Sequence, residues 1–325
     1  MSDLVTRPAL RLVFMGTPEF AAASLQGVFD AGFQIVGVVT ATDKPGGRGR
    51  ATMVTSAVKD KAIELGLPVL QPEKLRDPAF LEALQAWQAD LFVVVAFRML
   101  PEIVWSMPPW GTINLHGSLL PAYRGAAPIH WAVLNGERET GVTIFFLQHA
   151  IDTGDLLYQE RMPISPEETT GSVYQRMMAI GARALLRSLH LIAANEIILR
   201  PQDPSLVSHA PKIYPDMAQL DFSWPQSRLL NWIRGMTPVP GAWFMLEGKM
   251  VKVHHATGLA EQPDQPPGTL VLNGKILQIA APDGWILPLE LQLEGRRRVS
   301  VVDFINGMNW SPGIVGHITY QTASP

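Results

Sequence analysis

The sequence predicts an α/β protein in which a doubly wound, parallel-sheet domain is followed by a small β-barrel. Two observations predict this fold. Apolar, strand-like runs alternate with helical segments up to about residue 200, a pattern typical of a parallel sheet covered by helices on both faces. After the Pro- and Ser-containing stretch Asp203–Pro211, short alternating runs are separated by Gly, Asn-Gly and Asp-Gly turns, which indicates the hairpins of a small barrel.

The first elements can be justified in chain order. Leu10–Gly16 is an apolar run that ends in a Gly-Thr-Pro turn, where Thr17 is placed to cap the next helix. This turn lacks the spaced glycines of a dinucleotide fingerprint, so we reject NAD as a ligand. The further predicted strands are Phe33–Thr40, 67–70, Asp90–Phe97, Gly111–His116, 141–148 and 156–164, and the predicted helices are 19–32, 56–66, 78–89, 127–137 and 172–196.

The composition is that of a soluble globular protein. Hydrophobic residues make up 47% of the 325 positions and charged residues 17%, and no apolar run approaches the roughly 18 consecutive residues of a membrane span. The N-terminal residues lack a signal-peptide pattern, so we expect a cytoplasmic protein with no membrane partner. The chain has no cysteine, which excludes disulfides, thiolate metal sites and thiol nucleophiles; we expect no metal.

The charge excludes a uniformly basic, nucleic-acid-binding surface, because the formal net charge is −3. Two local patches remain. One is residues 43–61, with the basic residues Lys44, Arg48, Arg50, Lys59 and Lys61, and the other is Arg296–Arg298. Taken alone, each patch is more typical of a solvated loop or turn than of a binding site.

Asn114 and His116 stand at the end of the predicted strand Gly111–His116. Alternation along a strand places them on one face, and ligands of open α/β sheets bind beyond the carboxyl ends of the strands. An Asn amide can donate a hydrogen bond without changing charge, and His can donate or move a proton. The alternative is a half-buried polar pair that satisfies backbone groups.

Two further segments accompany this pair. Ser118–Pro121, followed by Arg124 and Gly125, predicts a shaped loop that either lines a flat ligand or simply packs at a turn. Asp152, in a Gly-containing loop, either orients the His116 ring or is an ordinary turn residue. Asn, His and Asp without a nucleophile suit a direct transfer in which the amine of the substrate attacks a carbonyl.

Four motifs carry a resemblance to a known family. MGTPEFA, TDKPGGRGR, INLHGSLLPAYRGAAPIHWAVLNGERETGVT and DTGDLLYQE occur in this order and closely resemble the methionyl-tRNA formyltransferases. The match covers most of the first domain, and APKI, LDFSW and PVPGAW extend it into the second. The long central motif is highly specific to enzymes that use 10-formyltetrahydrofolate and is less specific for the acceptor.

The resemblance implies a Rossmann-like catalytic domain over residues 1–203, a linker over 204–211 and an OB-fold-like, tRNA-binding barrel over 212–325. It implies formyl transfer from 10-formyltetrahydrofolate to the α-amino group of methionine on initiator tRNA, by a monomer. By position, Asn114 and His116 would hydrogen-bond the formyl oxygen while Asp152 supports His116 and relays the proton of the amine. The positions that match the folate-binding segment are Ser118, Leu119, Leu120 and Pro121.

The tRNA contacts that the resemblance implies are basic residues. Lys44, Arg48 and Arg50 match the segment that reaches the acceptor end of tRNA, and Lys212 falls at the interdomain connection. The two basic patches then become a hypothesis that they hold RNA phosphates. Residues 209–325 carry nine Lys or Arg against nine Asp or Glu, so the barrel would have to bind RNA by charge placement.

Arg98 departs from the family, because many relatives have a small residue there. The resemblance therefore does not define the rim of the folate pocket at this position. Alternative acceptors are glycinamide ribonucleotide, an amino-sugar nucleotide and water. The second domain argues against the first, and the GGRGR segment argues against the second. A catalytically silent RNA-binding protein is a different class, which the Asn114, His116 and Asp152 set disfavours.

Overall fold

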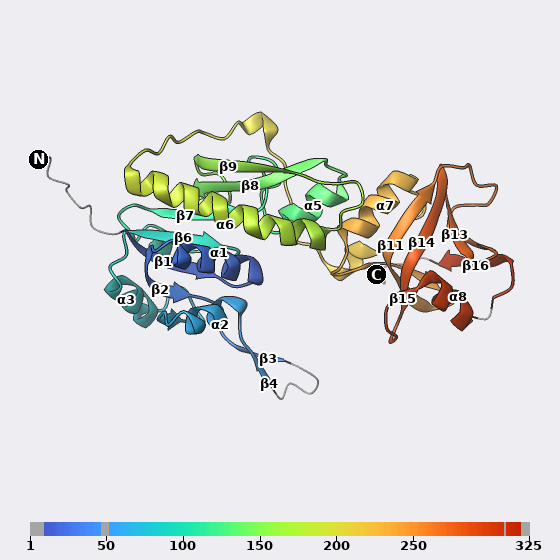
Figure 1. The fold of residues 1–325 in the computed structure, drawn as a ribbon, viewed down its shortest axis with the longest axis horizontal. Helices are drawn as coiled ribbons and strands as arrows, with labels where there is room; N and C mark the ends of the chain where they lie inside the picture. Colours follow the sequence, from blue (N-terminus) through green and yellow to red (C-terminus); the bar gives the residue numbers. More distant parts are fainter. Residues whose placement is uncertain (1–9, 47–51, 309, 320–325) are drawn as a thin grey trace, which may run out of the picture. The chain divides into compact units, whose positions relative to one another are not determined.

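Figure 1 shows the computed structural model of the chain, which describes residues 10–46, 52–308 and 310–319. The chain divides into two compact units. The first contains the described residues up to Gly125 together with Thr140–Met162 and Tyr174–His209, and the second contains Ala126–Glu139, Pro163–Val173 and the rest of the chain. The units are therefore interleaved in sequence, and helix α5 (Pro128–Leu134) belongs to the second.

The first unit is built on a seven-stranded sheet with the order β5-β2-β1-β6-β7-β8-β9. Its strands are β1 (Arg11–Gly16), β2 (Gln34–Val39), β5 (Val69–Leu70), β6 (Leu91–Val95), β7 (Thr112–His116), β8 (Glu139–Phe146) and β9 (Leu156–Pro163). The pairs from β5 to β7 are parallel, which confirms the predicted fold class. Val13, Phe92 and Val93 are buried in its interior.

Strand β8 runs antiparallel to β7, so the parallel part of the sheet ends at β7. A parallel connection needs a crossover that packs back onto the sheet. Helix α5, the element between β7 and β8, instead groups with the second unit. The alternation of strands and helices in the sequence does not reveal this reversal.

Five helices accompany this sheet: α1 (Glu19–Asp30), α2 (Ala57–Glu64), α3 (Pro78–Ala86), α4 (Glu102–Trp105) and α6 (Thr170–Ala194). The capping role expected for Thr17 is wrong, because the N-cap of α1 is Pro18 and no side chain caps it there. The hydroxyl of Tyr174 on α6 accepts a hydrogen bond from the Phe20 backbone N–H instead, at 3.1 Å. A distant helix therefore satisfies one of the free N–H groups of α1.

Helix α6 is long and apolar enough to cross a membrane by length and composition alone. Its apolar face is nevertheless part of the protein core. Met177, Leu185 and Leu189 are each 0% exposed, and a Cβ on Gly181 would contact the side chains of Leu115 and Phe20. The helix therefore packs as a core helix of the first unit.

The basic segment that follows β2 contains a short hairpin of β3 (Lys44–Gly46) and β4 (Thr52–Val54), visible at the lower edge of Figure 1. At its base, hydrogen bonds from Lys59 and Gln71 to the carboxylate of Asp43 hold the pKa of Asp43 below its usual value. Lys44 is exposed on β3. Arg48 and Arg50 lie outside the described residues.

The second unit contains an antiparallel barrel, as predicted. Its strands are β10 (Ala242–Leu246), β11 (Lys249–Leu259), β12 (Thr269–Asn273), β13 (Ile276–Ala281), β14 (Gly284–Leu293), β15 (Val299–Ser300) and β16 (Gly313–Thr319). They follow the order β11-β10-β16-β12-β13-β14-β15, and the pairing of β11 with β14 closes the barrel. Phe244, Val251 and Leu270 fill its interior.

Helices α7 (Gln226–Gly235) and α8 (Val301–Met308) and the 3₁₀ turns η2 (Pro204–Leu206) and η3 (Pro215–Ala218) complete the chain. In the second unit, Leu134 of α5 and Leu229 and Ile233 of α7 share one hydrophobic core with the barrel interior. A Cβ on Gly235 would overlap Leu134, so glycine permits the close approach of α7 to α5.

Candidate active site

Strand β7 positions Asn114 and His116 between two neighbouring strands. Asn114 pairs in register with Val94 of β6 and Phe145 of β8, and His116 pairs with Thr143 of β8. The two side chains lie on one face because strand residues alternate. Asn114 is half-buried and its carboxamide forms no hydrogen bond with another described residue, whereas His116 is 6% exposed. Asn114 thus keeps a free donor at the end of a buried strand.

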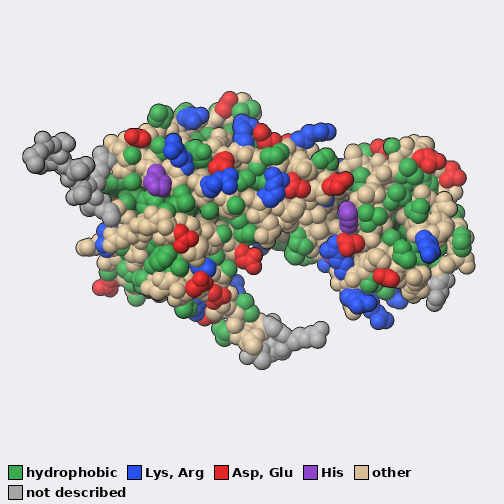
Figure 2. Space-filling view, in the orientation of Figure 1, with side chains coloured by type: hydrophobic (Ala, Val, Ile, Leu, Met, Phe, Trp, Pro, Cys, Tyr) green, Lys and Arg blue, Asp and Glu red, His purple; other side chains and the backbone are tan. Residues whose placement is uncertain are grey.

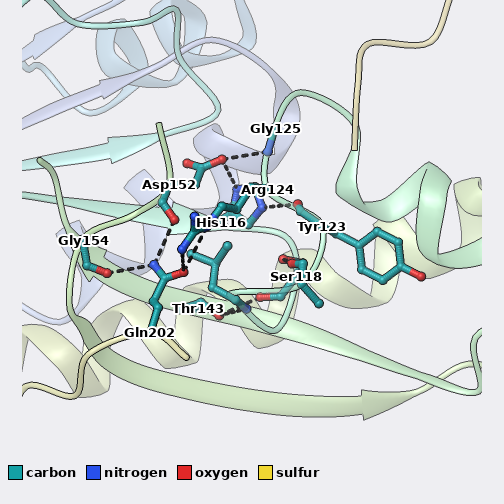
Figure 3. Close-up of polar contacts among 11 residues, drawn as sticks. His116, Ser118, Tyr123, Arg124, Gly125, Thr143, Asp152, Gly154 and Gln202 are labelled. Carbon is teal, nitrogen blue, oxygen red and sulfur yellow. Dashed lines mark hydrogen bonds and ion pairs between the residues drawn. The ribbon is translucent and has the colours of Figure 1, made fainter. Parts of the chain in front are cut away.

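The imidazole of His116 is held on one side by backbone and faces a carboxylate on the other (Figure 3). Nε2 lies 2.9 Å from the carbonyl oxygen of Tyr123. Because a carbonyl only accepts hydrogen bonds, this contact places a proton on Nε2. Nδ1 lies 3.7 Å from Oδ2 of Asp152, so it is the ring nitrogen that faces the carboxylate.

Asp152 is fixed by its own backbone conformation and by a partner. Its φ of +55° lies in the left-handed region, which Asp tolerates better than most residues. Oδ2 accepts a hydrogen bond from the Gly125 N–H at 2.8 Å, and the side chain is 11% exposed. One carboxylate oxygen therefore meets both a backbone donor and the His116 ring. The structure brings Asp152 and His116 together, which the sequence alone did not establish.

Gln202 and Arg124 hold the Asp152 loop. The sequence places Arg124 in the shaped loop after Pro121, whereas Gln202 was missed as a site residue. Gln202 Nε2 donates to the carbonyls of Asp152 and Gly154 at 2.9 and 2.8 Å. Its Oε1 accepts from Nε and Nη2 of Arg124 at 3.1 and 2.6 Å. Figure 3 shows Gln202 between the two loops. Gln202 follows the last predicted helix in a stretch without a motif, and nothing in its local sequence points to this role.

The loop from Ser118 to Pro121 is folded by a compact hydrogen-bond network. Ser118 Oγ donates to the Ala122 carbonyl at 2.6 Å, and Thr143 Oγ1 donates to the Ser118 carbonyl at 2.7 Å. The Leu120 N–H donates back to Thr143 Oγ1 at 3.0 Å, and Gln159 Nε2 donates to the Leu120 carbonyl at 2.9 Å. The polar atoms of this segment are thus used by one bond within the loop and by bonds to Thr143 of β8 and Gln159 of β9.

The four side chains that the resemblance assigns to folate differ in exposure. Ser118, Leu120 and Pro121 are buried, and Leu119 is half-buried. The buried three can shape the loop, and Leu119 can present apolar surface. Their role toward a ligand stays a prediction.

Arg98 links the loops that follow two other strands of the sheet. It lies just beyond β6, and its guanidinium donates to the carbonyls of Glu73, at 2.8 Å, and of Pro72. Those residues follow β5, which is three places from β6 in the sheet order. Arg98 therefore reaches past the carboxyl ends of β1 and β2. The residue before the loop, Ala96, has a φ of +46°, a region that few residues other than glycine adopt.

The remaining predicted site residues are cations at the surface. Lys212, in the second unit, is exposed and its Nζ lies 5.2 Å from the centroid of the Tyr214 ring, a cation–π distance. Lys44 is described above, and Arg48 and Arg50 fall outside the described residues. Within residues 10–46, 52–308 and 310–319, no group of three or more His, Asp or Glu side chains is arranged to hold a metal ion.

Comparison with known proteins gives two family matches along the chain. A family model described as "Formyl transferase" matches residues 10–189. A second model, "Formyl transferase, C-terminal domain", matches residues 212–309. Together they span both the sheet that carries Asn114 and His116 and most of the barrel.

Individual relatives are similar over nearly their whole length. A methionyl-tRNA formyltransferase of Bacteroides thetaiotaomicron is 44% identical over 314 residues, which is 94% of this chain and 97% of that protein. One of Parabacteroides distasonis is 45% identical over 309 residues, 92% of this chain and 95% of that protein. Among solved structures, an N-formyltransferase from Helicobacter canadensis, in complex with folinic acid and dTDP-3-aminofucose, has a TM-score of 0.66 at 19% identity and covers 86% of this chain and 98% of its own.

Proposed function

Because the chain belongs to the methionyl-tRNA formyltransferase family, we propose that it transfers the formyl group of 10-formyltetrahydrofolate to the α-amino group of methionine on initiator tRNA. The amine nitrogen forms a bond to the formyl carbon, and the bond from that carbon to N10 of the folate breaks. The amine loses a proton and N10 gains one. The observation that carries the proposal is the constellation of Asn114 and His116 at the end of β7 with Asp152 in the loop after β8, which contains no nucleophile of its own.

Asn114 supplies a donor for the formyl oxygen. Negative charge develops on this oxygen as the amine attacks, and a fixed amide N–H stabilises it more in the transition state than in the ground state. The Asn114 amide is half-buried and is not committed to another described residue. The Asn114 amide can therefore bind the formyl oxygen without first breaking a hydrogen bond within the protein.

His116 and Asp152 donate and accept protons in the proposed reaction. We propose that the Nε2–H of His116, which donates to the Tyr123 carbonyl, also donates to the formyl oxygen as negative charge develops on it. Nδ1 faces Asp152 at 3.7 Å, so the carboxylate stabilises an imidazolium and can receive the proton that the amine releases. The bond from Gly125 to Asp152 keeps this carboxylate oxygen in place.

The folate is held by the loop after β7. We assign one wall of its site to Ser118, Leu119, Leu120 and Pro121, because the loop begins two residues after His116 and its shape is set by internal bonds. Leu119 offers apolar surface to a flat ring, whereas the other three shape the wall from beneath. The donor itself is a folate of the 10-formyl type.

The tRNA is held by cations on both units. Lys44, with Arg48 and Arg50 in the segment between β3 and β4, would contact the acceptor end, and Lys212 would contact it at the connection to the barrel. Phosphate contacts of this kind make binding weaken as salt concentration rises. We keep residues 1–203 as the catalytic domain, 204–211 as the linker and 212–325 as the tRNA-binding domain, and we place the reaction in the cytoplasm, performed by a monomer.

The test is formylation of charged initiator tRNA by the full chain with 10-formyltetrahydrofolate. Charged elongator tRNA, free methionine and an amino-sugar nucleotide are the competing acceptors. We expect formyl transfer to the initiator tRNA and little to the others. Transfer to the sugar nucleotide alone would identify a sugar-nucleotide formyltransferase, and formate release without any acceptor would identify a hydrolase.

A further inference from the structure

Three consecutive arginines, Arg296–Arg298, lie exposed on the turn between β14 and β15. Arg298 is paired with Glu290 on β14. The side chains of Arg296 and Arg297 form no hydrogen bond or ion pair with any residue of the described ranges. Figure 2 shows Lys and Arg side chains projecting from this end of the barrel. Two uncompensated cations are thus presented side by side.

The turn is held from beneath by the side chain of Gln292. Gln292 Nε2 donates to the Arg296 carbonyl at 2.9 Å. The backbone adds a bond from the Arg296 N–H to the Leu293 carbonyl at 2.9 Å, and Gly295 takes the left-handed φ of +72° that the turn requires. The path of the chain through Arg296 is therefore held by this amide side chain together with one backbone bond and the conformation of Gly295.

Gln292 is in turn fixed by His254. A β-bulge in β11 at this position breaks the register with β14, and His254, which is 8% exposed, places its Nε2 at 2.9 Å from Gln292 Oε1. Because the amide nitrogen of Gln292 must face a carbonyl, its oxygen must face the ring, and Nε2 carries the proton. His254 Nδ1 has no hydrogen-bond partner among the described residues.

A buried imidazole with an unsatisfied nitrogen costs stability, so barrel packing alone does not favour His254. Lys252 lies opposite Gln292 in the β11–β14 register, but its Nζ donates to the Pro240 carbonyl at 2.7 Å and is committed there. His254 instead hydrogen-bonds the amide oxygen of Gln292, and the amide nitrogen of Gln292 hydrogen-bonds the Arg296 carbonyl. These contacts therefore link the buried His254 to the turn that carries the unpaired side chains of Arg296 and Arg297.

We propose that Arg296 and Arg297 bind RNA phosphates when the tRNA docks, and that Gln292, held by His254, is the positioning residue that keeps their turn in the binding conformation. This inference rests on the proposed function and names the part of the barrel that contacts the substrate. Guanidinium groups match phosphate geometry, and a preformed turn lowers the ordering cost of binding. An acidic segment of another protein is the competing occupant.

The first experiment measures the KM for initiator methionyl-tRNA at several salt concentrations with 10-formyltetrahydrofolate in excess. In the double variant Arg296→Ala, Arg297→Ala we expect KM to rise about three- to tenfold, and the slope of log KM against log salt to fall by about two, because each lost phosphate contact removes about 0.9. Values of kcat and of KM for the folate should not change. Lys275→Ala, an exposed cation on the β12–β13 turn, is the matched control and should leave KM unaltered.

The second experiment separates positioning from folding. Gln292→Leu should raise the KM for tRNA in the wild-type background and have no further effect in the Arg296→Ala, Arg297→Ala background. Gln278→Leu, a half-buried glutamine on β13, should have no effect in either background, and thermal unfolding checks that the barrel is intact. Equal effects of Gln292→Leu in both backgrounds would overturn its positioning role.

The outcomes separate this inference from the function on which it rests. A wild-type chain that formylates no tRNA contradicts both. A wild-type chain that formylates tRNA, with unchanged KM and salt slope in the double arginine variant, contradicts only the assignment of the turn. In that case Arg296 and Arg297 serve another partner or none.

Discussion

His116 and Asp152 face one another across 3.7 Å, a separation at which charge is felt but no direct hydrogen bond is formed. The same carboxylate oxygen already accepts a bond from Gly125. Asp152 can thus act on His116 through its charge while its position is set by backbone. The first prediction tests this division.

Asp152→Asn should abolish most activity without unfolding the protein. An Asn oxygen can still accept the Gly125 bond, whereas the negative charge beside His116 is lost. We expect kcat/KM to fall about 100- to 10,000-fold and the melting temperature to stay close to that of wild type. Asp155→Asn, three residues further in the same loop, is the control. Near-normal turnover in Asp152→Asn would remove the carboxylate from the proton path.

Asn114→Leu should separate catalysis from stability. The carboxamide has no partner among the described residues, so we expect the free energy of unfolding to change by less than about 0.5 kcal/mol. Loss of an oxyanion donor should lower kcat about 100- to 1,000-fold. Single-turnover formylation and urea unfolding give the two numbers. Loss of stability without loss of rate would assign Asn114 to the fold.

Gln202→Leu should loosen the Asp152 loop. The carbonyls of Asp152 and Gly154 would lose a donor and Arg124 would lose its acceptor, at a cost of about 1–3 kcal/mol for the groups left unsatisfied. We expect a lower melting temperature and a lower kcat, with faster amide exchange in residues 150–155. Gln85→Leu, exposed on α3, is the control. An unchanged exchange pattern would contradict the bracing role.

Arg98→Ala should act on the folate and leave the tRNA unaffected. The substitution releases the carbonyls of Pro72 and Glu73 from the loop after β6. We expect the KM for 10-formyltetrahydrofolate to rise several-fold, by about 3 to 10, as the loops lose a charge-assisted tie, with KM for tRNA unchanged. Arg76→Ala, exposed in the neighbouring segment, is the matched control. A rise in the KM for tRNA alone would place Arg98 at the other substrate.

Stability should fall in mild acid. Burial lowers the pKa of both His130 and His254 below the ordinary value of 6.5. Unfolding releases each ring to its normal pKa, so the unfolded chain binds more protons in this range, and the stabilisation present above pH 6.5 is lost as pH falls through the lower folded values.

We therefore expect the free energy of unfolding to decline below about pH 6.5 with a slope of up to two protons. His254→Phe should reduce that slope by up to one proton. Urea unfolding between pH 5 and 8 measures the wild type and this variant, and identical slopes would falsify the assignment.

Much of the fold could be predicted because local pattern and burial agree. The run Leu10–Gly16 becomes β1 at Arg11–Gly16, and the helix expected at 172–196 forms at Thr170–Ala194. The hairpin of β3 and β4 was not predicted, because its strands are three residues long and their exposed residues carry no alternating pattern. The reversal of β8 depends on where α5 packs, which is a tertiary property.

The candidate site shows the same limit. Asn114 and His116 could be placed together because they are two residues apart on one strand. Their relation to Asp152 could only be guessed, and Gln202 could not be found, because a side chain that bonds carbonyls 48 and 50 residues away leaves no local signal. Thr17 was a reasonable cap by residue type, but Tyr174, 154 residues from its partner, takes that role.

The bonds that Ser118, Thr143 and Gln159 form with the loop after β7 have a consequence for the proposed folate site. A loop whose polar atoms already have hydrogen-bond partners in the protein is ordered before a ligand binds. The conformational entropy of this loop is lost once, when the chain folds. In the proposed site, the donor would then enter and leave without ordering the loop again.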